Sequence, residues 1–336
     1  MALVNYTARN FGLRIQREAT FGTAIALSSN GMSTIPIESF TKTDGDVAHD
    51  DLMLTDTDRI KDTGDLYTNT INSNSSIPFS TLYRREYASY LLGAIFQTAS
   101  PGNTGTNPYV HTWTLHPTQP DFSANAGWFY SVVWDDPITA QDHLLKSCIL
   151  SQFSIKGNPT GKGKAALVTM DGTFWSPFSR AVEQTFSGTP STPSTNFLNS
   201  SLFSVTIAGG SALPVRSFSI DFTCNPFKIP TGGAAATIGW NIPFHSAKLK
   251  MELYWNADLA GYWSGLQAGT GYAIVLGNGV ATSSYESFAC TMNGRPIGEP
   301  PADSGGNAVM QLEYELVGSG ATAPISLVTT DAITGL

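Results

Sequence analysis

Eight aspartates crowd one short segment and form the chain's densest group of side chains able to bind a cation or a partner. They are Asp44, Asp46, Asp50, Asp51, Asp56, Asp58, Asp62 and Asp65, out of 26 acidic residues in all. A calcium loop needs a rhythm such as Asp-x-Asp-x-Asp-Gly, which this segment lacks. Two interpretations stay open: a solvated acidic loop, or an interaction loop, because long loops in compact domains are usually functional or disordered.

Motifs for catalysis are incomplete. A phosphate loop fails because Gly157 and Gly161 lie one residue too close and a glycine follows Lys162 where Ser or Thr is required. Ser39 and Lys42 fit the Ser-x-x-Lys form of some acyl-transfer enzymes, but no Ser-Asp-Asn or Lys-Thr-Gly partner follows. We therefore expect a protein that is not an enzyme.

Histidines and cysteines give no ligand set. His111 and His116 flank a strand-like segment, and five residues apart on a strand they point to opposite faces. Cys148, Cys224 and Cys290 have no paired spacing, which excludes a disulfide scaffold and a cysteine-type zinc site. We expect no metal and no cofactor, with Cys224 and Cys290 buried as small apolar residues.

Aromatic residues allow a second functional interpretation. They include Trp128, Phe129, Trp134, Trp175, Trp240, Trp255 and Trp263. If exposed together, they would form a platform for carbohydrate. Most alternate with polar residues in strand-like runs, which favours a place in the core.

The composition excludes other classes. Charged residues make up 13% of the chain, about half of the ~25% usual for soluble proteins. A surface with few charges suits contact with other protein, because little charge has to be desolvated. The net charge of −8 and the lack of clustered Lys and Arg argue against binding the nucleic-acid backbone. Neither a signal-peptide core nor an apolar run of ~20 residues is present, so we expect a soluble protein made in a reducing cytoplasm.

Period-2 alternation predicts a mainly β fold. Alternating apolar and polar residues mark strands over 149–156, 166–175, 218–224, 247–255 and 310–316. Apolar residues at three- and four-residue spacing predict one helix over 80–96, behind a cap at Ser80, and a shorter one over 258–267.

The two halves of the chain echo each other. Residues 35–41 read Ile-Pro-Ile-Glu-Ser-Phe-Thr and residues 213–219 read Leu-Pro-Val-Arg-Ser-Phe-Ser. In each half a helix and then a strand pair follow, and a Pro/Ser/Thr stretch over 187–195 has linker composition. We expect two tandem domains, 1–195 and 196–336, each a β-sandwich or barrel-forming unit with one short helix.

Read together, these features resemble the tail tube proteins (major tail proteins) of long-tailed bacteriophages. The opening from Leu13 to Ala24, with Glu18-x-Thr-x-Gly-Thr-Ala, is similar to the family's start. The segments from Glu286 to Gly294 and from Gly305 to Glu315 fit its closing strand pair. The likeness covers most of the chain and lies in element order and short motifs.

The resemblance implies a virion protein without catalytic residues. Its rings, a homotrimer of a duplicated chain or a homohexamer, would stack into a tube around the tape-measure protein, contact terminator and tip proteins, and conduct DNA during ejection. The acidic segment 44–65 would contact the neighbouring ring, and Glu313 and Glu315 would be lumen carboxylates. Residues 1–20 and 318–336 would become ordered on assembly. No membrane partner is expected.

Two rival interpretations remain. A carbohydrate-binding or adhesin-type β-sandwich is the first, and it would need exposed tryptophans. An enzyme is the second, and no nucleophile, base and orienting group can be assembled for it from the motifs.

Overall fold

A computed structural model describes most of the chain. The described residues are 12–26, 32–37, 39–40, 43–44, 48–51, 66–69, 75–96, 109–115, 129–135, 142–178, 181–182, 186–189, 197–230, 237–241, 245–280, 287–298, 302–304, 306–318 and 323–331. They form a mainly β structure with two α-helices within these ranges, as the patterning predicts. No helix in this part of the chain has the length and apolarity needed to cross a bilayer.

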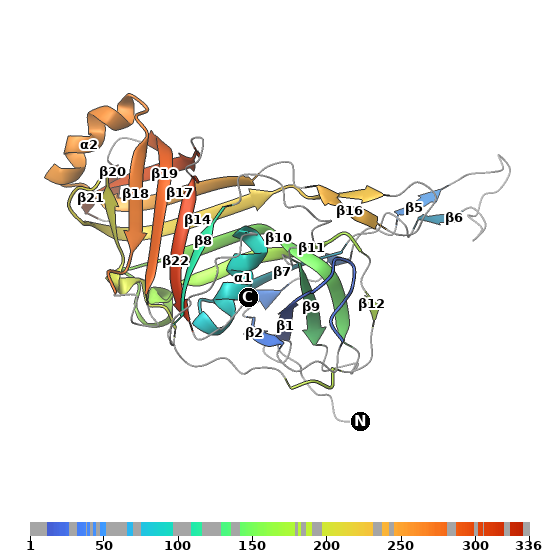
Figure 1. Cartoon of the computed structure of the whole chain (residues 1–336). Helices are drawn as coiled ribbons and strands as arrows, with labels where there is room; N and C mark the ends of the chain where they lie inside the picture. The colour runs from blue at the N-terminus through green and yellow to red at the C-terminus, as the bar shows by residue number, and fades with distance from the viewer. Residues whose placement is uncertain are drawn as a thin grey trace.

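One antiparallel sheet runs through both halves of the chain (Figure 1). Its strand positions, in order across the sheet, are β3 (Ser39–Phe40) with β4 (Thr43–Asp44), β7 (Ser75–Leu82), β11 (Thr169–Ser176), β10 (His143–Gly157), β14 (Leu213–Cys224), β17 (His245–Tyr254), β21 (Asn307–Leu316), and the end of β19 (Phe288–Gly298) with β20 (Ala302–Ser304). The pairing of β10 with β14 joins the halves. We call these eight positions the long sheet.

Each half follows the same circuit of pairings. In the second half, β13 (Ser204–Ile207) pairs with β14, and the path continues through β17, β21, β19 and β18 (Tyr272–Gly277) back to β13. In the first half, β1 (Gly12–Arg17) pairs with β2 (Ser33–Pro36), and the path continues through β3 and β4, β7, β11, β10 and β9 (Tyr130–Asp135) back to β1. The order of strands along the chain is the same in both circuits.

The echoing sequences occupy matching places in these circuits. Ile35 lies opposite Leu13 in the pairing of β1 with β2, and Leu213 lies opposite Val205 in the pairing of β13 with β14. A short β12 (Ala181–Val182) adds to β10 at the end of the first half. One hydrophobic core contains residues from both halves. The division near residue 195 stays a prediction.

The described parts of the two terminal segments contain paired strands at 12–17 and 325–331, which corrects for these parts the expectation that 1–20 and 318–336 become ordered on assembly. Residues 1–11, 319–322 and 332–336 lie outside the described residues. Leu13 and Ile15 of β1 are fully buried. At the other end, β22 (Ile325–Asp331) lies between β19 and β8 (Tyr109–Thr114) and buries Leu327. Alternating apolar residues give each segment a core face, so neither needs another copy to become a strand.

The first helix begins later than the sequence predicts. Residues 75–82 form β7, paired along its length with β11, and α1 is Arg85–Phe96. Ser80 is therefore a strand residue and not a helix cap, and its hydroxyl donates to Asp171 at 2.6 Å. The error arises because Ile77 and Phe79 also alternate with polar residues at period 2. The helix is buried on most sides and contacts β10, β22, β8, β2 and β1.

The second helix lies on the surface beside the second circuit (Figure 1). It is α2, Ala257–Gln267, within one residue of the prediction. The Asn256 side chain accepts from the Leu259 backbone N–H at 2.8 Å, which caps the first turn. Leu259 is buried, whereas Asp258 and Gly261 are exposed.

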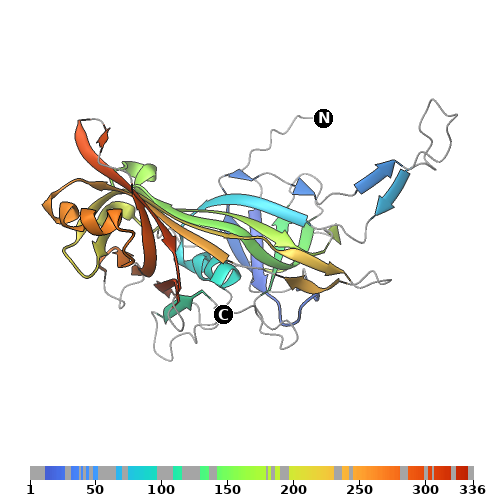
Figure 2. The same ribbon diagram turned by 90° about the horizontal axis from the view of Figure 1, so that it is seen from above.

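Two separate two-stranded sheets project from the same end of the molecule (Figures 1 and 2). The first pairs β5 (Ala48–Asp51) with β6 (Leu66–Asn69) and lies between β4 and β7 in the chain. The second pairs β15 (Phe227–Pro230) with β16 (Thr237–Asn241) and lies between β14 and β17. We call them the first and second arms. Each arm therefore follows the strand that holds the same place in its circuit, β4 in the first half and β14 in the second.

Candidate functional site: the polar face and the free edges of the long sheet

The long sheet has one apolar and one polar face. Along β14 and β17, Ile220 and Leu249 are buried, while Asp221 and Lys250 on the alternate positions reach solvent. The register aligns polar residues into rows across strands: Lys156 lies opposite Ser219, Ser219 opposite Lys250, and Lys250 opposite Glu313. A second row holds Ser154, Asp221, Lys248, Glu315 and Arg295. This arrangement exposes a mixed polar surface drawn from both halves.

Charges on the polar face pair with each other. The Lys156 ammonium donates to Asp171 at 2.7 Å across β10 and β11. Lys248 donates to Glu313 at 3.0 Å, and Lys250 lies 4.0 Å from the other oxygen of the same carboxylate. Hydrogen bonding and the charge of Glu313 raise the pKa of Lys248 above its usual value. Because cations and anions alternate, the face presents no basic patch.

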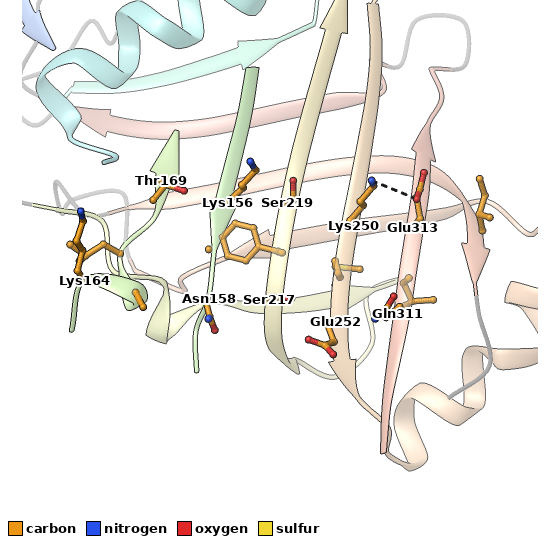
Figure 3. A pocket seen from close by; sticks show the side chains of 17 residues that line it. Lys156, Asn158, Lys164, Thr169, Ser217, Ser219, Lys250, Glu252, Gln311 and Glu313 are labelled. Carbon is orange, nitrogen blue, oxygen red and sulfur yellow. Dashed lines mark ion pairs between the residues drawn. The ribbon is translucent and has the colours of Figure 1, made fainter. Parts of the chain in front are cut away.

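Two neighbouring hollows lie on this face. The larger, of about 590 Å³, is lined mainly by polar and apolar residues of β10, β14, β17 and β21, with Lys156, Lys250 and Glu313 among them (Figure 3). The other, of about 490 Å³, shares Lys156 and continues toward β11 and β7. Together they hollow the part of the polar face that β7, β11, β10, β14, β17 and β21 share. Within the described ranges no group of three or more His, Cys, Asp or Glu could hold a metal ion.

The long sheet ends in two free edges. At one end β3 and β4 pair with β7, and at the other end Arg295–Gly298 and β20 pair with β21; no strand among the described residues covers their outer sides. Every neighbouring pair across the eight positions is antiparallel, so seven reversals separate the two edge strands. The edges therefore run in opposite directions, which is what antiparallel pairing between copies requires.

The described part of the acidic segment 44–65 lies in β4 and in β5 of the first arm. Asp44 lies in β4, and Asp50 and Asp51 lie in β5, so this part is paired strand and not the loop that the sequence suggests. The other predicted contact residues, Asp46, Asp56, Asp58, Asp62 and Asp65, lie outside the described residues. The second arm is not among the predicted contact segments, although Pro230-Thr-Gly-Gly233 has a composition typical of a turn.

The predicted lumen carboxylates lie on the polar face. Glu313 is partly exposed and bound to Lys248, and Glu315 is exposed opposite Lys248 and Arg295. The structure thus brings both residues into one surface with Asp171 and Lys156 of the first half.

Three of the five tryptophans whose side chains the structure describes lie in the core; Trp128 and the side chain of Trp240 lie outside the described residues. Trp113, Trp134 and Trp175 are buried. Trp255 and Trp263 are partly buried and pack edge to face, with ring centroids 6.2 Å apart. Among these five indoles none lies in a flat exposed row, and such a row would be needed for carbohydrate stacking.

Buried cysteines confirm the apolar role predicted for Cys224 and Cys290. Both thiols, and that of Cys148, are free and buried. Burial raises the pKa of Cys224 to about 12 and raises those of Cys148 and Cys290 as well. These thiols are therefore poor nucleophiles.

A buried carboxylate binds the segment that follows β1 to two neighbouring strands. Glu18 is 1% exposed and accepts three hydrogen bonds: from Ser131 Oγ at 2.7 Å, from the Ser147 N–H at 2.7 Å and from Ser147 Oγ at 2.8 Å. The two hydroxyls in turn accept from the N–H groups of Gly22 (2.7 Å) and Ile25 (3.0 Å). Burial raises the pKa of Glu18 despite these bonds. The Glu-x-Thr-x-Gly motif therefore anchors 18–25 to β9 and β10.

No family model matches the sequence, and no curated protein matches it significantly.

Proposed function

We propose that this chain is a structural protein that assembles with copies of itself into the tail tube of a long-tailed bacteriophage. The observation that supports it most is the long sheet: eight strand positions with one polar face and two uncovered edges of opposite direction. Such edges favour further pairing, and closure into a barrel removes them.

The proposed ring contains three chains. The two circuits support an internal duplication, because each half supplies four of the eight positions in the same order. Three chains of eight positions give twenty-four strands. With ~4.8 Å between strands and a tilt of ~40°, the backbone wall would be ~48 Å across. A ring of six chains is the alternative.

The polar face would line the lumen. Its alternating charges, with Glu313 held between Lys248 and Lys250, leave few free cations for phosphate. Each unpaired Lys or Arg would add affinity for DNA by releasing counterions. A mixed wall of this kind suits a conduit through which DNA passes without specific binding.

The two arms would join consecutive rings. Both project from the same end of the molecule, and each follows the first long-sheet strand of its half (Figure 2). The first arm is rich in aspartate, and the second carries Ile229 and Trp240. In the resemblance to tail tube proteins, the remaining partners are the tape-measure protein inside the tube and the terminator and tip proteins at its ends. The role is that of a non-enzymatic component of the virion tail.

Negative-stain microscopy of the purified protein tests the proposal. We expect rings or hollow tubes that become more abundant as protein concentration rises. Light scattering that reports monomers at every concentration, with the chain intact, would contradict it.

A further inference from the structure

The internal junction between β10 and β14 is a template for the junction between copies. In the first circuit β10 occupies the place that β19 and β20 occupy in the second, and β2 to β4 occupy the place of β14. The uncovered edges of the long sheet are therefore the counterparts of two strands that already pair inside each chain.

The register of the first edge follows from the strand beside it. Phe40 lies opposite Phe79, and Phe218 lies opposite Met251. Phe79 and Met251 each precede the first residue of the following helix by six positions, so they correspond. Phe40 then corresponds to Phe218.

The sequence echo gives the same alignment independently. Placing 35–41 over 213–219 also puts Phe40 over Phe218. Continuing along the strand, Asp44 lies opposite Ser75, and Phe222 lies opposite Ala247. Ser75 and Ala247 both precede their helices by ten positions, so Asp44 corresponds to Phe222.

The register of the second edge follows in the same way. Phe153 lies opposite Gly172, which lies opposite Phe79. Gly298 lies opposite Leu312, which lies opposite Met251. Gly298 therefore corresponds to Phe153.

Inside the chain, Phe153 lies opposite Phe222. We infer that a second copy of this chain docks edge to edge on the long sheet, with Gly298 of one copy opposite Asp44 of the next. This inference rests on the proposed self-assembly and adds its register.

Further along the edge, Lys156 leads through Thr169 to Leu82, and Ala302 leads through Val309 to Tyr254. Leu82 and Tyr254 both precede their helices by three positions, so Ala302 corresponds to Lys156 and Asp303 to Gly157. Because Gly157 lies opposite Phe218 inside the chain, Asp303 should lie opposite Phe40 between copies.

The two junctions differ in chemistry. The aromatic rings of Phe153 and Phe222 stack inside the chain with centroids 6.3 Å apart. At the corresponding positions between copies stand Gly298 and Asp44. The junction between copies therefore lacks this aromatic pair, and we expect rings to dissociate on dilution before the halves of a chain separate.

Paired cysteines test the register. Residues 44 and 298 lie seven strand spacings apart within a chain, ~34 Å at ~4.8 Å per spacing, so a disulfide between them must join two copies. Directly opposite residues in antiparallel strands have Cα atoms ~4.5–5.5 Å apart, within the range that a disulfide spans. The three native thiols are buried and do not compete.

We expect the variant Asp44→Cys with Gly298→Cys to give a ladder of covalent oligomers on mild oxidation. The matched control, Thr43→Cys with Gly298→Cys, moves one thiol to the neighbouring position, whose side chain points to the other face. It should crosslink at least tenfold less, and either cysteine alone should give no ladder. A second pair, Phe40→Cys with Asp303→Cys, tests the same register if the first variant does not fold.

The outcomes separate the register from the assembly. Rings or tubes of both variants under reducing conditions, with no preference for the 44–298 and 40–303 pairs on oxidation, would overturn the register and leave the proposed function standing. Wild-type protein that forms no rings or tubes would overturn both. A ladder specific to these pairs supports the inference.

Discussion

Glu18 should make folding stability depend on pH in a direction that the structure fixes, and replacing it should remove that dependence. Glu18→Gln keeps the size of the side chain, and its amide oxygen can still accept from the Ser147 N–H. Glu18→Ala removes all three hydrogen bonds that the carboxylate accepts. A buried N–H left without a partner costs ~1–3 kcal/mol, and lost packing adds to this. We therefore expect Glu18→Ala to lower the unfolding free energy at pH 7 by ~2–4 kcal/mol, and Glu18→Gln by less.

The sign of the pH dependence follows from the raised pKa of Glu18. A carboxyl group whose pKa is higher in the folded state binds its proton more tightly there. Its stabilising effect is then greatest at low pH and is lost as pH rises from about 4.5, its ordinary value, through the folded pKa. Relative to Glu18→Gln, which does not titrate, the wild type should gain stability as pH falls from 7 toward 4.5.

Urea unfolding at several pH values, at a concentration where the protein is monomeric, measures this difference. Subtracting the curve of Glu18→Gln cancels the other titrating groups. Glu315→Gln on the exposed polar face is a matched control that breaks no buried hydrogen bond. A wild-type advantage over Glu18→Gln that is flat or shrinks toward pH 4.5 would refute the reasoning.

Three further predictions concern the junction, the lumen and the arms. Gly157→Ala should lower the free energy of chemical unfolding by ~1–3 kcal/mol, because the new Cβ would lie 2.4 Å from the Phe218 ring. Gly261→Ala, on the open face of α2, should raise it by ~0.5–1 kcal/mol. Glu313→Lys with Glu315→Lys should make assembled tubes retain duplex DNA at 50 mM salt in co-sedimentation. The affinity should fall about tenfold by 200 mM salt, because log affinity falls with log salt concentration by ~0.9 per phosphate contact. Retention no greater than that of wild type would exclude a lumen role. Shortening residues 45–65 should leave the melting temperature unchanged and shorten tubes in micrographs; shortening residues 231–236 of the second arm is the matched comparison, and tubes of normal length from both would remove the arms from stacking.

The strands could be predicted because each has one face in the core. Alternation at Phe218–Cys224 and Met310–Leu316 marks segments that the structure pairs as β14 and β21. Burial of Cys224 and Cys290 follows from the same pattern. Local periodicity fails where two periods overlap: residues 75–82 alternate, and residues 82–96 carry helical spacing, so the boundary at 85 depends on pairing with β11.

The long sheet and the arms could not be read from local patterns. The contact of Gln152 with Thr223 joins residues on either side of the linker-like stretch, and nothing in either strand's own sequence names its partner. Likewise, the place of Ile325–Asp331 between β19 and β8 is set by which edge is left uncovered. These choices depend on the closure of a whole circuit, and they decide which polar residues share one face.

The short sequence echo becomes informative once it is placed in the sheet. Seven residues with few identities carry little weight alone. Pairing with β7 and β17, counted back from the first residue of α1 and of α2, aligns Phe40 with Phe218 independently of the echo. Glu18 and Gly22 anchor the segment after β1 to Ser147 of β10, and β1 pairs with β2 in the first pairing of the first circuit. The second circuit has the same order and supplies β14, which pairs with β10 of the first circuit. In the proposed ring, the internal junction and the junction between copies would use the same edge geometry. They would differ in strength, because Phe153 and Phe222 stack in the internal junction while Gly298 and Asp44 stand at the corresponding positions between copies.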